Sequence, residues 1–575
     1  MSLIASLGAI EIGLIFGLVA LGVFLSFRII NFPDLTVDGS FPLGGAVAAA
    51  LIVAGWNPFA ATAAAVVAGA LAGYLTAWLN VHLRIMQLLA SILVMIALYS
   101  VNLRIMGKPN VALIDEPTVF SLLDFGGIPD YWAKPLVLLV IVIAAKVLID
   151  LFFASEIGLA MRATGGNPRM ARAQGISTNR LTVWGLALSN ALVALAGALF
   201  VQSQGGADIS MGIGTIVIGL AAVIIGETIL PARSLVVTTL ACILGAVLYR
   251  FFIALALNSD FIGLKAQDLN LVTALLVAFA LLIPGYRRKL AGLWPGGARQ
   301  FGGSRRQGRQ IMLRAKGLEI TFNPGTPIEN RVLRGLDLNI PTGQFVTVIG
   351  SNGVGKSTFL NAVSGDLMVD RGSIRIDDKD VTRRSAWQRS DLVARVFQDP
   401  MAGTCEALTI EENMALAWKR GARRGFGFSL NRPLRELFRD KLSILKLGLE
   451  NRLADRIGLL SGGQRQAVSL LMASLQPSRI LLLDEHTAAL DPKTAAFVLE
   501  LTARIVEAGK LTAMMVTHSM RQALDHGSRT VMLHEGRVIL DIEGPERAGM
   551  DVPDLLHMFE QTRGEKLDDD KLLLV

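Results

Sequence analysis

Cysteine and histidine are rare in this sequence of 575 residues, which has two cysteines and six histidines. Cys242 and Cys405 lie one in each half of the chain, so they cannot build a disulfide framework or a cysteine-rich metal site. We therefore expect two reduced thiols with structural roles.

Charged residues are also scarce, but only in the first half. Residues 1–286 hold 26 of the 102 Asp, Glu, Lys and Arg residues, with 13 of each sign. A stretch this long with so few charges excludes a soluble first half, whereas the second half is as charged as an ordinary soluble domain. The net charge of +8 lies in the second half, and seven of its basic residues gather in 287–310, so the pI of 9.6 does not predict nucleic-acid binding.

The apolar runs of the first half predict a polytopic α-helical membrane domain with about nine spans. A helix needs about 20 apolar residues to cross a bilayer. The predicted spans are 8–27, 42–56, 58–79, 86–106, 134–153, 181–203, 212–231, 234–257 and 268–285.

Loop charges predict how these spans are oriented. The loop at 155–180 carries four arginines and one glutamate, and basic residues also follow position 286, whereas the loop at 107–133 is acidic. Because positively charged loops stay in the cytoplasm, we expect the N-terminus outside and the second half in the cytoplasm.

The segment 31–42 interrupts the apolar pattern with two prolines, two aspartates and a glycine. It is either a broken helix beside the permeation path or a cytoplasmic loop, since irregular backbone at membrane depth must be buried in protein or line water. In the first case, Asp34 and Asp38 are candidates for the translocation path. Glu11 and Glu227 lie within predicted spans, where an acid is also a candidate for function.

Two stretches of the first half carry a resemblance to a known family. They are 22–50 and 158–176, the second of which reads GLAMRATGGNPRMARAQGI. They resemble the permeases of ABC importers for branched-chain amino acids and simple sugars, in which the second stretch forms a short cytoplasmic coupling helix that docks on the ATPase. The resemblance implies coupling roles for Arg162, Asn167 and Arg172, and the two arginines would face the acidic residues of 404–412.

The local sequence also predicts where the coupling helix begins. Asn167 is followed by Pro168. Asparagine is a good N-cap and proline suits the first turn of a helix, so we expect a helix that starts at this pair.

Composition divides the chain into four parts. These are a permease domain at 1–286, a basic cytoplasmic linker at 287–311, a nucleotide-binding domain at 312–563 and a tail at 564–575. The linker contains glycines and no long apolar run, which is typical of a solvated tether beside anionic lipid headgroups.

A phosphate-binding loop follows the apolar strand predicted at 345–350. The stretch 350–358 reads GSNGVGKST and matches the pattern G-x-x-x-x-G-K-[ST]. Its backbone N–H groups, its lysine and the N-terminus of the next helix would surround the phosphates of a nucleotide, while Ser357 would hold Mg²⁺. The candidate nucleotide-binding residues here are Gly350, Ser351, Asn352, Gly353, Gly355, Lys356, Ser357 and Thr358.

A second apolar strand, predicted at 480–483, ends in the acid pair Asp484 and Glu485. Asp484 would bind the Mg²⁺ shell and Glu485 would activate the attacking water, since phosphoryl transfer relies on positioning and charge neutralisation. Between the two strands, a serine and two glycines before a helix predict a second anion-binding nest. Its residues are Ser461, Gly462, Gly463 and Gln464.

The motif LSGGQ at 460–464 is the signature of ABC ATPases, and the resemblance to that family covers about 313–545. It implies an α/β P-loop ATPase fold with ATP and Mg²⁺ as cofactors. In that family, the residue at Gln398 senses Mg²⁺ and contacts the transporter half, and the histidine at His518 contacts the γ-phosphate. The resemblance further implies that Phe322 stacks on adenine and that Asp491 belongs to the D-loop.

The chain departs from most of that family at His486, which stands where a proline is usual. This departure leaves the candidate catalytic residues Glu485, His518 and Gln398 in place. At this position the chain resembles a subgroup of ABC importers whose substrates include aromatic amino acids such as tryptophan.

These features predict one protomer of an ATP-driven ABC importer in a bacterial inner membrane, carrying a small solute such as an aromatic or branched-chain amino acid. One P-loop and one signature per chain imply a homodimer, because in this family the signature of one ATPase covers the nucleotide on the other. No external loop is long enough to form a domain, so a separate solute-binding protein would dock outside. A half-transporter exporter and a regulatory ABC protein without transport are the alternatives.

Overall fold

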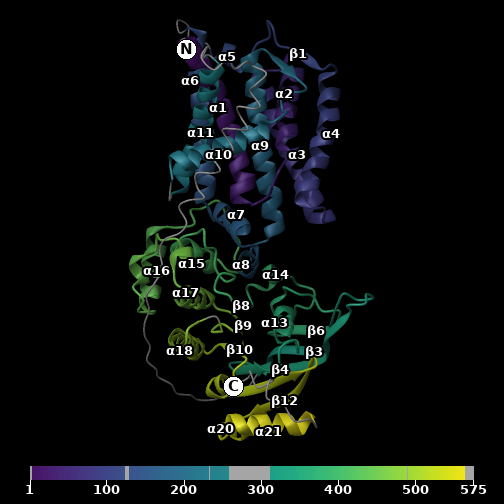
Figure 1. The fold of residues 1–575 in the computed structure, drawn as a ribbon, viewed down its shortest axis with the longest axis vertical. Helices are drawn as coiled ribbons and strands as arrows, with labels where there is room; N and C mark the ends of the chain where they lie inside the picture. Colours follow the sequence, from purple (N-terminus) through teal and green to yellow (C-terminus); the bar gives the residue numbers. More distant parts are fainter. Residues whose placement is uncertain (1–2, 124–128, 232–233, 258–310, 489, 564–575) are drawn as a thin grey trace. The chain divides into compact units, whose positions relative to one another are not determined.

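The computed structural model describes residues 3–123, 129–231, 234–257, 311–488 and 490–563, which form two compact units (Figure 1). The first unit holds the described residues up to Gly166 and those from Thr178 to Leu257. The second holds Asn167–Ser177 and the described residues from Ile311 onward. The division therefore assigns a short segment of the permease sequence to the same unit as the predicted ATPase. The ninth predicted span, residues 287–310 of the linker and the tail at 564–575 lie outside the described residues.

The first unit is a bundle of helices with one short two-stranded sheet. A π-helix, η1, directly continues the first helix. Its elements are α1 (Leu3–Val23), η1 (Phe24–Ile29), α2 (Val37–Val53), α3 (Pro58–Leu83), α4 (Gln87–Met106), β1 (Asn110–Ala112), α5 (Val119–Leu122), α6 (Asp130–Ala154), α7 (Glu156–Gly166), α9 (Thr178–Gln204), β2 (Gly206–Asp208), α10 (Thr215–Ile229) and α11 (Leu235–Leu257).

Each of the first eight predicted spans coincides with a helix of this unit. Six helices of the described residues are long and apolar enough to cross a membrane. Two further apolar helices, α2 and α10, are shorter. The structure therefore agrees with a polytopic membrane domain and distinguishes long spans from short ones.

Small residues allow the helices to pack backbone against backbone. A Cβ added at Gly73 of α3 would lie 2.1 Å from the Leu186 carbonyl oxygen of α9, and one at Gly69 would lie 2.5 Å from that of Asn190. Close contact of this kind stabilises helix pairs in a bilayer, where no hydrophobic effect separates helix from lipid. The glycines and alanines of these helices are thus explained by packing.

The interruption predicted at 31–42 is present and lies inside the bundle. Asn31 adopts a left-handed conformation with φ 58°, and α2 begins only at Val37. Phe32, Asp34 and Thr36 between them are fully buried. Of the two interpretations open from the sequence, this burial favours a broken helix within the protein.

The second unit contains two sheets and the helices around them. Its elements are α8 (Pro168–Ala173), β3 (Ile311–Phe322), β4 (Asn330–Pro341), β5 (Phe345–Ile349), α13 (Lys356–Ser364), β6 (Arg371–Ile376), β7 (Lys379–Asp380), α14 (Ala386–Arg389), β8 (Val393–Val396), α15 (Ile410–Trp418), α16 (Arg432–Ser443), η4 (Leu449–Asn451), η5 (Ile457–Leu459), α17 (Gly462–Ser474), β9 (Ile480–Asp484), α18 (Pro492–Gly509), β10 (Thr512–Val516), α19 (Met520–Asp525), β11 (Arg529–His534), β12 (Arg537–Glu543), α20 (Pro545–Ala548) and α21 (Val552–Arg563).

The larger sheet places the ends of several motif-bearing strands side by side. Its order is β12-β11-β5-β10-β9-β8, with β12 antiparallel to β11 and all other neighbours parallel. Asp484 of β9 pairs in register with Val516 of β10. The loops after β5, β8, β9 and β10 therefore emerge at one edge, where open α/β sheets bind ligands. The smaller sheet is antiparallel, in the order β4-β3-β6-β7.

Candidate functional site

The phosphate-binding loop connects β5 to α13 and depends on its glycines. Gly350, Gly353 and Gly355 have φ values of 148°, 79° and 104°, which residues with a Cβ rarely adopt. The Lys356 Nζ donates to the carbonyl oxygens of Gly350 (2.7 Å) and Ser351 (3.0 Å), which hold the ammonium across the loop. Burial lowers the pKa of Lys356. The loop therefore presents a pre-positioned cation and the N-terminus of α13 to a phosphate group.

The remaining residues of the loop take the places that the motif predicts. Asn352 is exposed, and Ser357 and Thr358 lie in the first turn of α13. The hydroxyl of Ser357 faces the Asp484 carboxylate across the sheet edge, with 3.5 Å between its Oγ and Oδ1. The structure thus brings together the two residues predicted to hold a metal ion.

Glu485 lies between the other two predicted catalytic side chains. Its Oε1 is 2.6 Å from the Nε2 of His518, which follows β10. Its Oε2 accepts a hydrogen bond of 2.9 Å from the Nε2 of Gln398, which follows β8. Glu485 directly follows the end of β9 and has a φ of 40°, which is uncommon for a residue with a side chain. Three loops that are distant in sequence therefore fix one nearly buried carboxylate.

The predicted signature residues cap a helix. Ser461 is the N-cap of α17 and forms a reciprocal capping box with Gln464, while Gly462 and Gly463 open the helix. Asp491 similarly caps α18 through the backbone N–H of Thr494. Within the described part of the chain, no hydrogen bond or ion pair joins the signature residues to the phosphate-binding loop. Phe322 ends β3 with 39% of its surface exposed.

His486, the departure from the usual proline, is a buried residue with a structural contact. Its Nε2 is 2.9 Å from the Thr502 hydroxyl of α18. Burial lowers the pKa of His486 to about 4, so the ring is neutral at pH 7. The histidine therefore ties α18 to the strand that carries the acid pair.

The predicted coupling helix begins at Asn167 and Pro168, as the sequence indicates, and forms α8 within the second unit. The Asn167 Oδ1 accepts a hydrogen bond from the backbone N–H of Met170, so asparagine is the N-cap. Its Nδ2 faces three backbone carbonyl oxygens, those of Met401 (2.9 Å), Ala402 (3.1 Å) and Thr404 (2.8 Å). One amide thus starts the helix and also binds the loop that follows Gln398.

The resemblance implied that Arg162 and Arg172 both face the acidic residues of 404–412, but the two arginines belong to different units. Arg172 lies in α8 with part of its side chain exposed, whereas Arg162 belongs to α7 of the first unit. Glu411, one of the acids expected to meet them, pairs with Arg435 through both carboxylate oxygens at 2.8 and 3.0 Å. Arg169 of α8 contacts ATPase residues, with its guanidinium over the ring of Phe397.

The membrane unit holds its predicted acids in hydrogen bonds. Asp34 accepts from the Thr36 N–H (3.0 Å) and the Asn190 Nδ2 (2.7 Å) and is fully buried. Asp38 accepts from the backbone N–H groups of Ile216 (2.7 Å) and Gly214 (3.3 Å) at the start of α10. The other two acids have partners as well, because Glu11 accepts from Ser203 and Glu227 pairs with Arg28.

Comparison with known proteins gives the family. A family model described as "Branched-chain amino acid transport system / permease component" matches residues 7–283, and one described as "ABC transporter" matches residues 333–488. The "Tyrosine transport ATP-binding protein" of Clostridioides difficile is 43% identical over 251 residues, which are 43% of this chain and 99% of that protein. The chain belongs to the ABC transporter family.

Two further matches concern the separate halves of this ABC transporter. The "Tyrosine transport system permease protein" of Clostridioides difficile is 38% identical over 265 residues, which are 46% of this chain and 86% of that protein. Among solved structures, the ATP-binding cassette MJ0796 in a dimeric post-hydrolysis state is 29% identical, with a TM-score of 0.35, and the match covers 40% of this chain and 98% of that one. The transporter therefore joins a membrane-embedded permease to an ATPase that binds ATP and couples its hydrolysis to transport.

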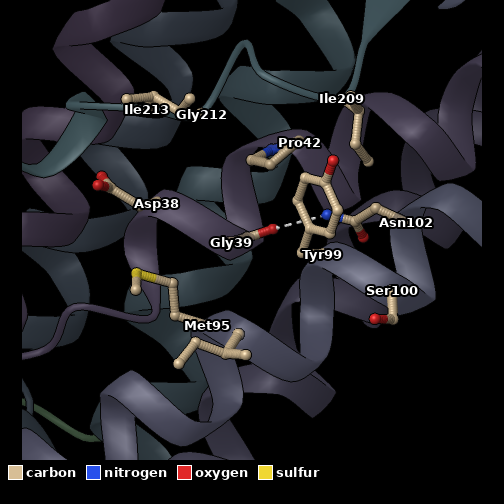
Figure 2. A pocket seen from close by; sticks show the side chains of 11 residues that line it. Asp38, Gly39, Pro42, Met95, Tyr99, Ser100, Asn102, Ile209, Gly212 and Ile213 are labelled. Carbon is tan, nitrogen blue, oxygen red and sulfur yellow. Dashed lines mark hydrogen bonds between the residues drawn. The ribbon is translucent and has the colours of Figure 1, made fainter. Parts of the chain in front are cut away.

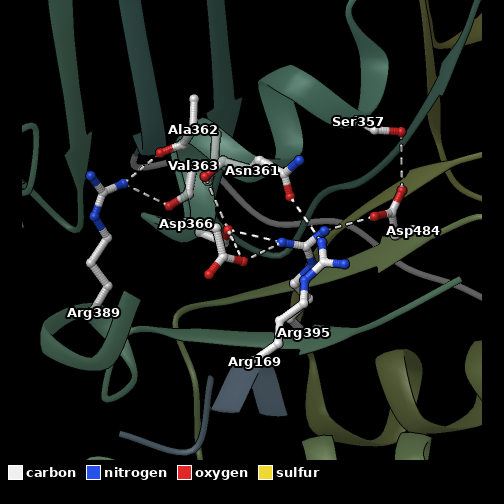
Figure 3. A network of polar contacts seen from close by, with 10 residues as sticks. Arg169, Ser357, Asn361, Ala362, Val363, Asp366, Arg389, Arg395 and Asp484 are labelled. Carbon is white, nitrogen blue, oxygen red and sulfur yellow. Dashed lines mark hydrogen bonds and ion pairs between the residues drawn. The ribbon is translucent and has the colours of Figure 1, made fainter. Parts of the chain in front are cut away.

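The sequence did not reveal a buried arginine that joins the elements of the ATPase site (Figure 3). Arg395 in β8 donates to the carboxylates of Asp366 and Asp484, each at 2.7 Å, and to the Ser364 hydroxyl at 3.1 Å. Its side chain is 2% exposed. Burial lowers the pKa of Arg395, and the two carboxylates oppose that effect. The sequence feature that could have indicated this role is an arginine within an otherwise apolar strand. A charge at such a position needs buried partners.

The same arginine reaches the coupling helix through an aromatic ring. The guanidinium carbon of Arg395 lies 4.6 Å from the ring centroid of Phe397, and that of Arg169 from α8 lies 4.9 Å from the same centroid. Arg169 also donates to Asn361 of α13 at 3.5 Å. A cation–π contact of this kind contributes about 0.5–2 kcal/mol. Phe397 thus lies between the coupling helix and the arginine that holds Asp484.

Proposed function

We propose that this ABC transporter is one protomer of a homodimeric importer that carries an aromatic amino acid, with tyrosine the first candidate, into the cytoplasm. The observation that carries the proposal is that both halves match components of a tyrosine transport system in one organism. Two separate relatives that align with successive halves of one chain indicate a fusion of the same permease and ATPase pair.

The candidate ATPase residues can be assigned to steps of hydrolysis. Lys356 and the backbone of the phosphate-binding loop bind the β- and γ-phosphates. Glu485 orients the attacking water and accepts its proton, while His518 and Gln398 hold its carboxylate in place. Because phosphoryl transfer is catalysed mainly by positioning and electrostatics, three loops on one rigid sheet edge suit this task.

The residues also fit a bound Mg²⁺. A hydroxyl and a carboxylate oxygen 3.5 Å apart, from Ser357 and Asp484, are ligands of the type that Mg²⁺ prefers. Gln398 can supply a third oxygen from the neighbouring loop. The ion would neutralise charge on the phosphates, and the protein residues would fix its place.

The separation of the signature from the phosphate-binding loop supports a homodimer. The backbone N–H groups at the start of α17 can bind an anion. A second copy would supply its signature to the nucleotide of the first. Asp491, at the start of the next helix, would lie near the same junction.

Coupling to the permease is assigned to α8. Asn167 binds the backbone that follows Gln398, and Arg169 stacks on Phe397 beside it. A displacement of this loop when nucleotide binds would therefore move the helix that joins the membrane spans. Arg162 and Arg172 would contribute through the charge of the segment.

We place the protein in a bacterial cytoplasmic membrane, with its N-terminus outside and its ATPase in the cytoplasm. A separate solute-binding protein would deliver the amino acid to the external face. The acidic loop at 107–133 offers a surface there for a partner of opposite charge.

The test is uptake of labelled L-tyrosine by proteoliposomes that contain ATP, with and without a tyrosine-binding solute-binding protein. Accumulation inside that requires ATP and the partner supports the proposal. The Glu485→Gln variant is the control for ATP hydrolysis. ATP-driven release of tyrosine from the ATP-containing compartment, without a partner, would identify an exporter and refute the import direction.

A further inference from the structure

A cavity of about 500 Å³ opens within the membrane unit, at mid-length of α4 (Figure 2). Residues from α2, from α4 and from the segment between β2 and α10 form its wall. They are Asp38, Gly39, Pro42, Met95, Ile96, Tyr99, Ser100, Asn102, Ile209, Gly212 and Ile213. The volume is sufficient for an amino acid with a large side chain.

The described lining of this cavity combines one carboxylate with the hydroxyls of Tyr99 and Ser100 and the amide of Asn102. Asp38 brings a carboxylate, two of whose acceptor positions bind the N–H groups at the start of α10. A carboxylate has about four such positions, so it retains capacity for another donor. Among the described residues that line the cavity there is no lysine, arginine or histidine. The charge that these residues present to a ligand is therefore negative.

The amide of Asn102 lies behind the surface of the cavity wall. Its side chain is fully buried, and its Nδ2 donates to the carbonyl oxygen of Gly39 at 3.2 Å. Its Oδ1 is buried as well and has no hydrogen-bond partner among the described residues. Because this oxygen exposes no surface to the cavity, a bound ligand would reach it only if the amide turned, so the carboxylate of Asp38 is the acceptor that the cavity presents.

Packing holds Asp38 in a fixed place. A Cβ at Gly212 would lie 2.1 Å from the carbonyl oxygen of Asp38, so the two segments touch through their backbones. The rest of the wall is mostly apolar and includes Met95, Ile96, Ile213 and the ring of Tyr99. A helix cap alone would explain the position of Asp38, but it would not require a cavity beside it.

We propose that this cavity binds the ammonium group of the transported amino acid through Asp38, with the apolar side chain against Met95, Ile96 and Tyr99. This assignment rests on the proposed function for the identity of the solute. The chemistry alone selects a primary ammonium on an apolar or aromatic body. A solute with only a carboxylate would be repelled by Asp38 and would find no cation among the lining residues that the structure describes.

The charge of the cavity can be tested without transport. Ser100 lies on the wall with its side chain exposed, so Ser100→Cys provides a reporter thiol. The native Cys242 and Cys405 are buried and provide little background. The full-length protein in nanodiscs is treated with a cationic aminoethyl and an anionic sulfonatoethyl methanethiosulfonate. The ratio of the two rates reports the local potential.

We expect the cationic reagent to be favoured and Asp38→Asn to lower that preference about tenfold, whereas Asp38→Glu retains it. A cysteine at Ala112, exposed on β1 and outside the cavity, is the matched control and should not respond to either variant. An unchanged ratio in Asp38→Asn would overturn the proposal. A cysteine at position 100 that reacts with neither reagent would overturn it as well, because the cavity would then be closed to molecules of this size.

Ligand protection separates this inference from the import proposal. Tyrosine and tyramine, which both carry an ammonium, should slow modification of the cysteine at position 100. The analogue 3-(4-hydroxyphenyl)propionate, which has no ammonium, should not protect it, and Asp38→Asn should abolish protection by the other two. Protection without uptake would support the cavity and refute the importer, whereas uptake with equal protection by all three compounds would refute the cavity alone.

Discussion

The contacts of Asn167 allow capping of the coupling helix to be separated from its docking. Asn167→Asp keeps an oxygen that accepts the Met170 N–H, so the helix cap remains, since aspartate caps as well as asparagine. The same change replaces the Nδ2 donor by an acceptor that faces three carbonyl oxygens at 2.8–3.1 Å. Docking should therefore weaken while α8 stays helical.

The magnitude follows from the number of bonds lost. The side-chain amide of Asn167 has two N–H groups but faces three carbonyl oxygens, so one N–H group is shared between two of these oxygens. We therefore count two hydrogen bonds. At about 0.5–1.5 kcal/mol each, their loss costs about 1–3 kcal/mol, or about 5- to 150-fold in the docking equilibrium. Repulsion between the new carboxylate and the carbonyl oxygens places the expected value in the upper part of that range.

The assay compares tyrosine uptake per ATP hydrolysed in proteoliposomes, together with amide hydrogen exchange of residues 401–404. Asn431→Asp is the matched control, because Asn431 caps α16 through the Leu434 N–H at 2.9 Å in the same way. We expect Asn167→Asp to lower uptake per ATP and to speed exchange at 401–404, and the control to change neither. Normal coupling in Asn167→Asp, with faster exchange, would show that these hydrogen bonds do not transmit the motion.

Three further predictions concern the ATPase site. Glu485→Gln should lower ATP hydrolysis by about 10²–10⁴-fold while nucleotide binding persists, because the amide cannot accept a proton; a wild-type hydrolysis rate would refute its assignment as the base. Lys356→Ala should weaken nucleotide binding, and mixing these chains with Ser461→Arg chains should restore part of the activity if sites are shared across a homodimer; no recovery in dimers shown to form would count against that arrangement. Arg395→Met should destabilise the ATPase by about 3–5 kcal/mol because it leaves the buried Asp484 carboxylate and the partly buried Asp366 carboxylate without their cation, and adding Asp366→Asn should recover part of this loss in a thermal-unfolding measurement; equal stability of the single and double variants would contradict the ion-pair argument.

Much of the ATPase site could be read from the sequence, because its parts are local. The phosphate-binding loop needs glycines at fixed positions before a helix, and the structure has positive φ at Gly350, Gly353 and Gly355. Asn167 before Pro168 likewise predicts a helix start that the structure contains. Such features depend on the conformational preferences of a few consecutive residues, so no distant contact is needed to infer them.

The membrane spans were predictable for a similar reason. A helix must be apolar over a minimum length to cross a bilayer, so each span can be recognised from the composition of its own residues. The span predicted at 42–56 was already short, because the interruption at 31–42 precedes it. The span predicted at 212–231 is longer than α10 (Thr215–Ile229), because the apolar pattern also includes residues that precede the helix. Burial of Phe32, Asp34 and Thr36 depends on neighbouring helices rather than on their own sequence.

The partners of the charged groups were decided only by the tertiary structure. Arg395 finds Asp366 and Asp484 because strand order places β8 beside β9, and Asp38 meets the start of α10 because the chain returns to it 176 residues later. A buried arginine and a membrane aspartate need partners wherever they occur, since unpaired polar groups in a low-dielectric interior cost several kcal/mol, about 2–7 for a neutral group and more for a charge. The sequence could not show which residues those partners are, because register and helix packing are set by side-chain contacts summed over the whole chain.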